Sequence, residues 1–126
     1  MSIQSFKDLK AWQLGMDVVE GVYHLTDKFP KSEIYGLANQ MRRSAISIPS
    51  NLAEGQDRDS TKEFIHFIAI SIGSLCELET QLLIAHRLKY CQSSDIEAVM
   101  SKLAEAGRTI RGLQKAIKSK LDPPTH

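Results

Sequence analysis

The sequence predicts an all-α protein that folds as an antiparallel up-down-up-down four-helix bundle. Apolar residues recur at three- and four-residue intervals over four long segments, the period of a helix with one buried face. Short stretches with proline, glycine or capping residues separate these segments, and β-type alternation is absent. Because the connections are short, consecutive helices should be antiparallel neighbours. The 126 residues predict one bundle domain over 1–121 and a frayed tail at 122–126.

The first two helices are predicted over about 6–29 and 32–55. Pro30 ends the first, because proline restricts the residue before it and cannot continue a helix. Ser32 is the expected N-cap of the second helix and Gly55 the residue just after its last turn. The apolar stripe of the first helix consists of Leu9, Trp12, Met16, Val19 and Tyr23.

The third and fourth helices are predicted over about 60–90 and 94–121. Each opens on a capping-box pattern, Ser60 with Glu63 and Ser94 with Glu97, in which the serine accepts a hydrogen bond from the third helical amide. The core stripe of the fourth helix consists of Ile96, Val99, Leu103, Ala106, Ile110, Leu113 and Ile117.

Composition excludes several classes of protein. A formal net charge of +1 argues against a bulk polyanion binder, although it permits a local basic patch. The sequence shows neither a signal peptide nor an apolar run of the ~18–20 residues that span a bilayer, so we expect a cytoplasmic protein without a membrane partner. Cys76 and Cys91 are expected to be buried or half-buried unpaired thiols in a reducing compartment.

The third helix is apolar around more of its circumference than one core contact requires. One stripe consists of Phe64, Phe67, Ile68, Ser71, Leu75, Leu78 and Leu82. A second consists of Ile65, Ile72, Cys76, Leu83 and Ile84. So wide an arc indicates either a second contact surface, most simply with another copy of the chain, or a central helix crowded by its three neighbours.

The segment 42–55 continues a helical pattern through Pro49, which costs roughly 3 kcal/mol in a helix interior. The bend could simply wrap the second helix around the core, or it could direct Asn51 and Glu54 at a neighbouring subunit. In the third helix, the small residues Gly73 and Ser74 predict close approach of another backbone, from the region around residues 44–47.

Two carboxylates of the third helix lie among apolar residues and need partners. For Glu77 and Glu79, the available partners are Arg42 and Arg43 on the adjacent antiparallel helix, and arginine suits a bidentate pair. We therefore predict at least one ion pair between these groups, within or between subunits, with a structural role.

No catalytic constellation or cofactor motif is apparent, so the chain is predicted to be non-enzymatic and without cofactors. Glu63 and His66 match half of the di-iron bundle motif, but no other histidine has a glutamate three residues before it. A metal site is therefore not expected.

The fourth helix has the best signal for nucleic-acid binding. Arg108, Arg111, Lys115 and Lys118 follow three- and four-residue spacing on a face predicted to lie about 160° from the core stripe, with Lys102 and Lys120 adding to it. A solvated face that complements the helix dipole explains this pattern, and so does a stripe that binds phosphates. No aromatic residue interleaves with the stripe, so stacking on single strands is not indicated.

Three motifs resemble the four-helix-bundle family named after the 23S rRNA intervening-sequence proteins. They are Arg42-Arg43-x-x-x-Ser47-Ile48-Pro49-x-Asn51-x-Ala53-Glu54-Gly55, Ile70-x-x-Gly73-Ser74-x-x-Glu77-x-Glu79-Thr80-Gln81-Leu82 with Leu88-x-Tyr90, and Phe6-Lys7-Asp8-Leu9-x-x-Trp12. The resemblance covers about residues 6–118. It implies a small bacterial bundle that assembles as a ring-shaped homopentamer.

The resemblance implies little about activity, because most members have none assigned. Their reading frames lie in segments inserted into 23S rRNA genes or stand alone. A relative, the accessory variability protein of diversity-generating retroelements, binds a reverse transcriptase and nucleic acid. We expect an interaction or scaffolding role, with an accessory role on nucleic acid or ribonucleoprotein as the alternative.

Overall fold

A computed structural model describes residues 5–121. It contains four α-helices, α1 (Lys10–Thr26), α2 (Leu37–Gln56), α3 (Thr61–Arg87) and α4 (Ser93–Leu121). Short 3₁₀ turns at Phe6–Asp8 and Lys31–Glu33 precede α1 and α2. The described residues contain no strand.

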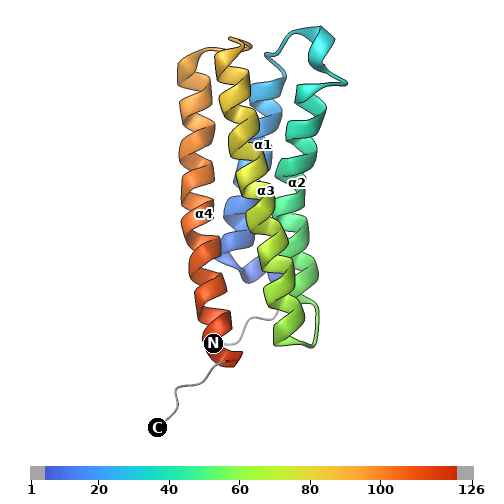
Figure 1. Cartoon of the computed structure of the whole chain (residues 1–126), viewed down its shortest axis with the longest axis vertical. Helices are drawn as coiled ribbons and strands as arrows, with labels where there is room; N and C mark the ends of the chain where they lie inside the picture. The colour runs from blue at the N-terminus through green and yellow to red at the C-terminus, as the bar shows by residue number, and fades with distance from the viewer. Residues whose placement is uncertain (1–4, 122–126) are drawn as a thin grey trace.

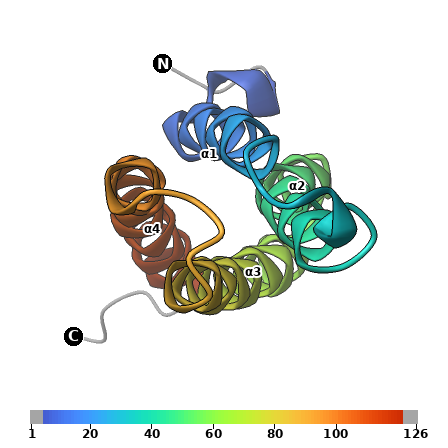
Figure 2. The same ribbon diagram turned by 90° about the horizontal axis from the view of Figure 1, so that it is seen from above.

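The helices run alternately up and down along a common long axis (Figure 1). Seen from above, they occupy the corners of a square in chain order, so that each helix packs against the previous and the next, and α4 returns to α1 (Figure 2). The predicted four-helix bundle is therefore confirmed.

The core is a continuous apolar column to which every helix contributes. Its members with no exposed surface are Val18, Val22, Met41, Ala45, Ile48, Leu52, Ile68, Leu78, Leu82, Ala85, Ala106 and Ile110. Leu113 and Ile117, predicted as core, are only half-buried. They line a groove of about 460 Å³ with Leu9 and Phe64, at the end of the bundle where α1 begins and α4 ends. The core is thus less completely filled at that end.

The connection between α1 and α2 is longer than the sequence predicts. Ser32 lies in a 3₁₀ turn rather than at a helix N-cap, and α2 begins only at Leu37. Glu33 supplies the capping contact instead, because its Oε2 accepts a hydrogen bond from the Leu37 N–H at 3.0 Å. A carboxylate at this position satisfies one of the free amides of the first helical turn.

Gly55 has a different role from the predicted one. It does not terminate α2, which continues to Gln56, and it lies buried within the last helical turn. A Cβ placed on Gly55 would lie 2.7 Å from the Cβ of Phe67 and 2.9 Å from Cδ1 of Phe64. Glycine here permits close contact between the end of α2 and the start of α3.

Capping explains the bounds of α3. The Ser60 Oγ accepts a hydrogen bond from the Glu63 N–H at 3.2 Å, as predicted. The helix ends at Arg87, three residues before the predicted end, because Lys89 adopts a left-handed conformation with φ 58°. The Lys89 and Tyr90 amides then donate to the carbonyls of His86 and Ala85, the paired bonds of a Schellman motif.

The last helix begins at Ser93, one residue before the predicted start, and continues to Leu121. The predicted tail at 122–126 lies outside the described residues.

Candidate functional site

Serine hydroxyls surround the proline of α2. Ser47 accepts hydrogen bonds from the Asn51 side-chain amide, at 2.8 Å on its carbonyl and 2.9 Å on its Oγ. From α3, Ser74 donates to the Ser47 Oγ at 2.8 Å, and Ser71 donates to the Ile48 carbonyl at 2.9 Å. Asn51 is thus bonded inside its own chain, which favours a bend that wraps α2 around the core.

The ring of Pro49 is buried against α1. A Cβ placed on Gly15 would lie 3.4 Å from the Pro49 Cβ and 3.4 Å from Cγ2 of Ile48, so α1 and α2 approach closely here. Glu54, one turn further, is partly exposed and pairs with Arg58 at 2.8 Å.

Arg42 does not pair with the glutamates of α3. Its guanidinium contacts the end of α1 instead, donating to Thr26 Oγ1 at 2.8 Å and to Asp27 Oδ1 at 3.0 Å. The guanidinium carbon also lies 4.6 Å from the ring centroid of Tyr23. Within residues 5–121 the predicted ion pair does not form, because the acceptors at the end of α1 are nearer to Arg42 than those on α3. A pair between subunits stays a prediction.

The α3 carboxylates have other surroundings. Glu77 is exposed and accepts a hydrogen bond from Ser44 Oγ at 2.6 Å. Arg43 and Glu79 are exposed, and neither forms an ion pair within residues 5–121. Glu77, Arg43 and the buried Gln81 line a polar groove of about 320 Å³ between α2 and α3, where the Gln81 Oε1 has no hydrogen-bond partner.

The small residues of α3 differ in their surroundings. Ser74 is buried and makes the predicted close approach to α2 through Ser47. Gly73 does not, because a Cβ placed there would meet no atom within 4 Å.

Cys76, expected to be buried or half-buried, is exposed, whereas Cys91 is half-buried. Loss of solvent around Cys91 raises the pKa of its thiol, and the charge of Asp95 adds to this effect.

The flank of α3 on the side of α4 carries an apolar stripe that the chain does not bury. We name it the α3 outer face, and it consists of Ile65, Ala69, Ile72, Cys76, Glu79 and Leu83, spaced by 4-3-4-3-4 residues. Five of the six are apolar, none of the six is buried, and Leu83 is 48% exposed. Ile70 and Ile84 are exposed as well, elsewhere around the circumference of α3.

By length and mean composition alone, α3 is apolar enough to cross a membrane, although it contains no uninterrupted apolar run of that length. The core helix of a bundle has the same composition, but only 33% of the apolar window of α3 is buried within this chain. The excess of apolar surface over buried surface marks α3 as a helix that this single chain leaves partly uncovered.

The basic stripe of α4 consists of Arg108, Arg111, Lys115 and Lys118, and all four side chains are exposed. None forms an ion pair within residues 5–121. Arg108 and Arg111 line a groove of about 320 Å³ with Cys76 and Glu79 of α3. The stripe therefore adjoins the α3 outer face, rather than lying isolated on the side of α4 opposite the core.

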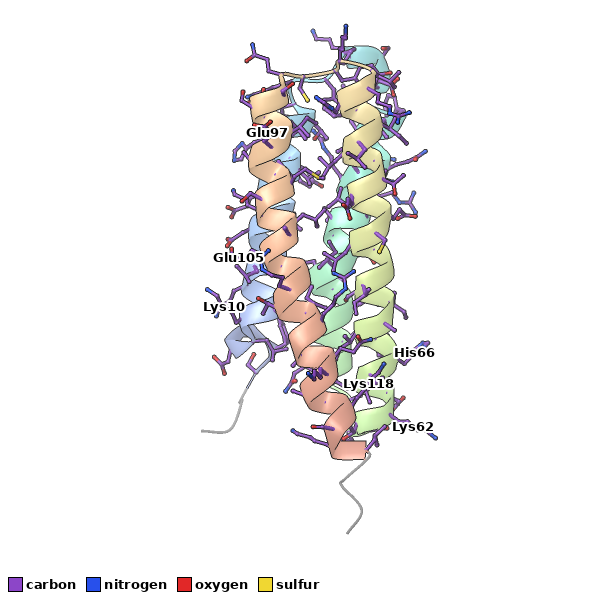
Figure 3. All side chains as sticks on the ribbon, turned by 60° about the vertical axis from the view of Figure 1, so that its left-hand side comes forward. Lys10, Lys62, His66, Glu97, Glu105 and Lys118 are labelled. Atoms are coloured by element: carbon purple, nitrogen blue, oxygen red, sulfur yellow. The ribbon has the colours of Figure 1, made fainter. Side chains whose placement is uncertain are left out.

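Lys102 does not join the basic stripe, contrary to the prediction. Its side chain lies over Gly21 in the groove between α1 and α4. Along α4, acidic residues such as Glu97 occupy the first half and the basic stripe the second. Figure 3 shows Glu97 near one end of the bundle, and Lys118 toward the other end, where Lys62 and His66 of α3 also lie.

Two contacts join the connections at the upper end of the bundle in Figure 1. The Tyr90 hydroxyl donates to Glu33 Oε1 at 2.7 Å, and Lys28 pairs with Asp95 at 2.8 Å. The Leu37 amide and then the Tyr90 hydroxyl lower the pKa of the Glu33 carboxyl below its ordinary value of 4.5. The same bond to Glu33 raises the pKa of the Tyr90 hydroxyl.

This coupling predicts a dependence of stability on pH. Because the folded state lowers the pKa of Glu33, its contribution is complete above the ordinary value of 4.5 and is lost as pH falls through the lowered value. Tyr90→Phe removes one of the two donors and should reduce the loss of stability between pH 5 and pH 3. Thermal melts of both proteins over this range measure the difference, and parallel curves would contradict it.

Within residues 5–121, no group of three or more His, Cys, Asp or Glu side chains is placed to hold a metal ion. His66 is exposed, and its ring lies against Phe67, with centroids 5.6 Å apart. Among the described residues, the α3 outer face and the basic stripe of α4 are surfaces that the single chain leaves exposed.

Comparison with known families decides the relationship. The model of the family described as 23S rRNA-intervening sequence protein matches residues 7–112. The chain belongs to this family. The match confirms the resemblance carried by the motifs around Pro49 and Glu77. Arg108 and Arg111 lie inside the matched segment, and Lys115 and Lys118 lie beyond it.

A solved structure supports the fold of this 23S rRNA-intervening sequence protein. It is a protein of unknown function from the S23 ribosomal protein family of Bacteroides thetaiotaomicron. It aligns with a TM-score of 0.77 and 19% sequence identity, over 83% of this chain and 95% of that chain. At this identity the likeness establishes the fold alone. No curated protein matches the chain.

Proposed function

We propose that this 23S rRNA-intervening sequence protein is a non-enzymatic, homo-oligomeric bundle with an interaction or scaffolding role. The α3 outer face supports this proposal. It presents five apolar side chains at regular helical spacing, and apolar residues gathered in this way on a small domain mark a protein contact. Its family relatives are expected to assemble as ring-shaped homopentamers, so another copy is the simplest partner.

Native mass spectrometry of the unmodified protein tests this proposal. We expect a species with at least twice the chain mass of 14.1 kDa. A mass five times that of the chain would match the homopentamer expected from the family. The same spectrum reports any bound ligand. A single species near 14.1 kDa at micromolar concentration would overturn the proposal.

A second candidate function is binding of nucleic acid or ribonucleoprotein through the basic stripe of α4. Its support is four exposed cations on one side of a helix, without ion-pair partners within the described residues. Assembly of several copies would bring several stripes together and increase the local positive potential. Binding of this kind follows the phosphate backbone and has little sequence preference.

Reversal of two stripe charges tests this second function. Arg108→Glu with Arg111→Glu removes two cations and adds two anions, so retention on RNA or DNA at low salt should fall at least about tenfold. Retention of the unmodified protein should also fall steeply as salt rises. Glu105→Lys, on the same helix, is the matched control and should not weaken binding. Equal retention of the double variant and the unmodified protein would contradict this function.

A further inference from the structure

A second exposed apolar surface lies between α1 and α2. It is a groove of about 320 Å³ that one polar residue, Ser50, lines together with the apolar residues Trp12, Met16, Val19, Ile46, Pro49 and Ala53. Ile46 is 41% exposed and Met16 40% exposed, so this groove, like the α3 outer face, presents large apolar side chains that the chain does not cover.

The two surfaces belong to different sides of the bundle. Figure 2 shows α1 and α2 at neighbouring corners of the square, whereas the α3 outer face belongs to the next corner, where Cys76 and Glu79 adjoin α4. Because the two surfaces lie on different sides, a two-fold contact would pair each surface with the same surface of a second copy. A contact between unlike surfaces covers both at once in every copy, and it repeats from copy to copy until a ring closes.

The residues on the two surfaces recur at the same intervals along their helices. The outward line of α2 consists of Asn39, Arg43, Ile46, Ser50 and Ala53, separated by 4-3-4-3 residues. The α3 outer face has the same alternation, and helices with this repeat pack along a common seam. In an antiparallel register, Ile46 lies opposite Cys76, Ser50 opposite Ile72, and Ala53 opposite Ala69.

The same register places Arg43 opposite Glu79. Each is the charged residue of its own line, each is exposed, and neither has an ion-pair partner within residues 5–121. On α1, the carboxylates of Asp17 and Glu20 are exposed as well. Apolar surfaces and charges therefore match in one arrangement.

We propose that the α3 outer face of one copy docks against the α1–α2 groove of the next copy, with Arg43 of one paired to Glu79 of the other. The contact is head-to-tail, so every copy uses both surfaces. This inference rests on the proposed homo-oligomeric function and deepens it, because it names which surfaces meet and which charges select the register.

Cysteine crosslinking tests the register directly, since Cys76 is already exposed on the α3 outer face. In a Cys91→Ala background, Ile46→Cys adds a thiol that the proposed register places opposite Cys76 of the next copy. A disulfide forms only where the two Cα atoms come within ~4.4–6.8 Å, so crosslinking reports this register. Mild oxidation should then produce dimers, trimers and larger species on a denaturing gel. Ser101→Cys in the same background is the matched control and should yield no such series.

The alternatives give different results. A protein that keeps Cys76 alone and crosslinks to a dimer would show two α3 outer faces in contact and overturn the proposal. An oligomer by native mass spectrometry that fails to crosslink through Ile46→Cys would overturn the register and leave the proposed function standing. A monomer of 14.1 kDa would overturn both.

Charge exchange provides an independent test. Arg43→Glu and Glu79→Arg each place like charges in contact, so each should weaken assembly by about tenfold or more. The double variant restores opposite charges at every contact and should recover most of the assembly. If the double variant instead assembles more weakly than either single variant, Arg43 and Glu79 are not in contact.

Discussion

Replacing Gly55 with alanine should destabilise the bundle by about 2 kcal/mol, because the added methyl group overfills a packed contact. The new Cβ would lie 2.7 Å from the Cβ of Phe67, an atom held by the backbone of α3. Neither helix can yield without shifting against the other. Urea denaturation of the two proteins measures the difference in the free energy of unfolding.

Gly112→Ala is the matched control for this prediction. Gly112 also lies inside a helix, but a Cβ there would meet no atom within 4 Å. Alanine should therefore stabilise α4 by about 0.5–1 kcal/mol, the usual gain over glycine in a helix interior. Equal effects of the two substitutions would show that the contact between Gly55 and Phe67 does not limit packing.

Leu83→Lys should convert the proposed oligomer into a folded monomer. Leu83 is 48% exposed in the single chain, so a lysine there costs the isolated bundle little. In the assembly the same side chain would be buried, and full burial of a leucine contributes about 1.5–3 kcal/mol. A buried ammonium group without a partner is a further penalty.

Sedimentation and circular dichroism together measure this result. We expect a mass near 14.1 kDa with unchanged helix content. Ser101→Lys, on the exposed side of α4, is the control and should leave the mass unchanged. An assembly that survives Leu83→Lys would show that the α3 outer face is not its contact surface.

Much of the fold could be predicted from local patterns. The four helices follow from apolar periodicity, and the start of α3 follows from the Ser60–Glu63 capping pattern, because these signals act over a few residues. The end of α3 could not be predicted in this way. It depends on Lys89 in a left-handed conformation, which local preference assigns to glycine.

The contacts of single polar residues were harder to predict. Sequence spacing offers Arg42 the glutamates of α3, but the Thr26 hydroxyl and the Asp27 carboxylate at the end of α1 lie nearer in the folded chain. Gly55 carries the usual signal of a helix end, and only the position of Phe67 reveals its packing role. These contacts join segments distant in sequence, so tertiary structure decides them.

The wide apolar arc of α3 is the feature of the sequence that indicates a contact surface. It left two interpretations open, crowding by neighbours or a second surface, and the exposure of Cys76 and Leu83 favours the second. The α1–α2 groove was missed, because Met16 fits the apolar stripe of the first helix and its exposure is known only from the fold.

The two ends of the bundle differ in the contacts that stabilise them, and this difference determines where local unfolding begins. At one end, Tyr90 with Glu33 and Lys28 with Asp95 join successive connections, whereas the other end has half-buried Leu113 and Ile117 beside an open groove. Local unfolding begins where fewest contacts must break. Amide protons in the last turns of α4 should therefore exchange with solvent well before those beside Tyr90. Unfolding should begin at the end of the bundle that holds Leu113 and Ile117.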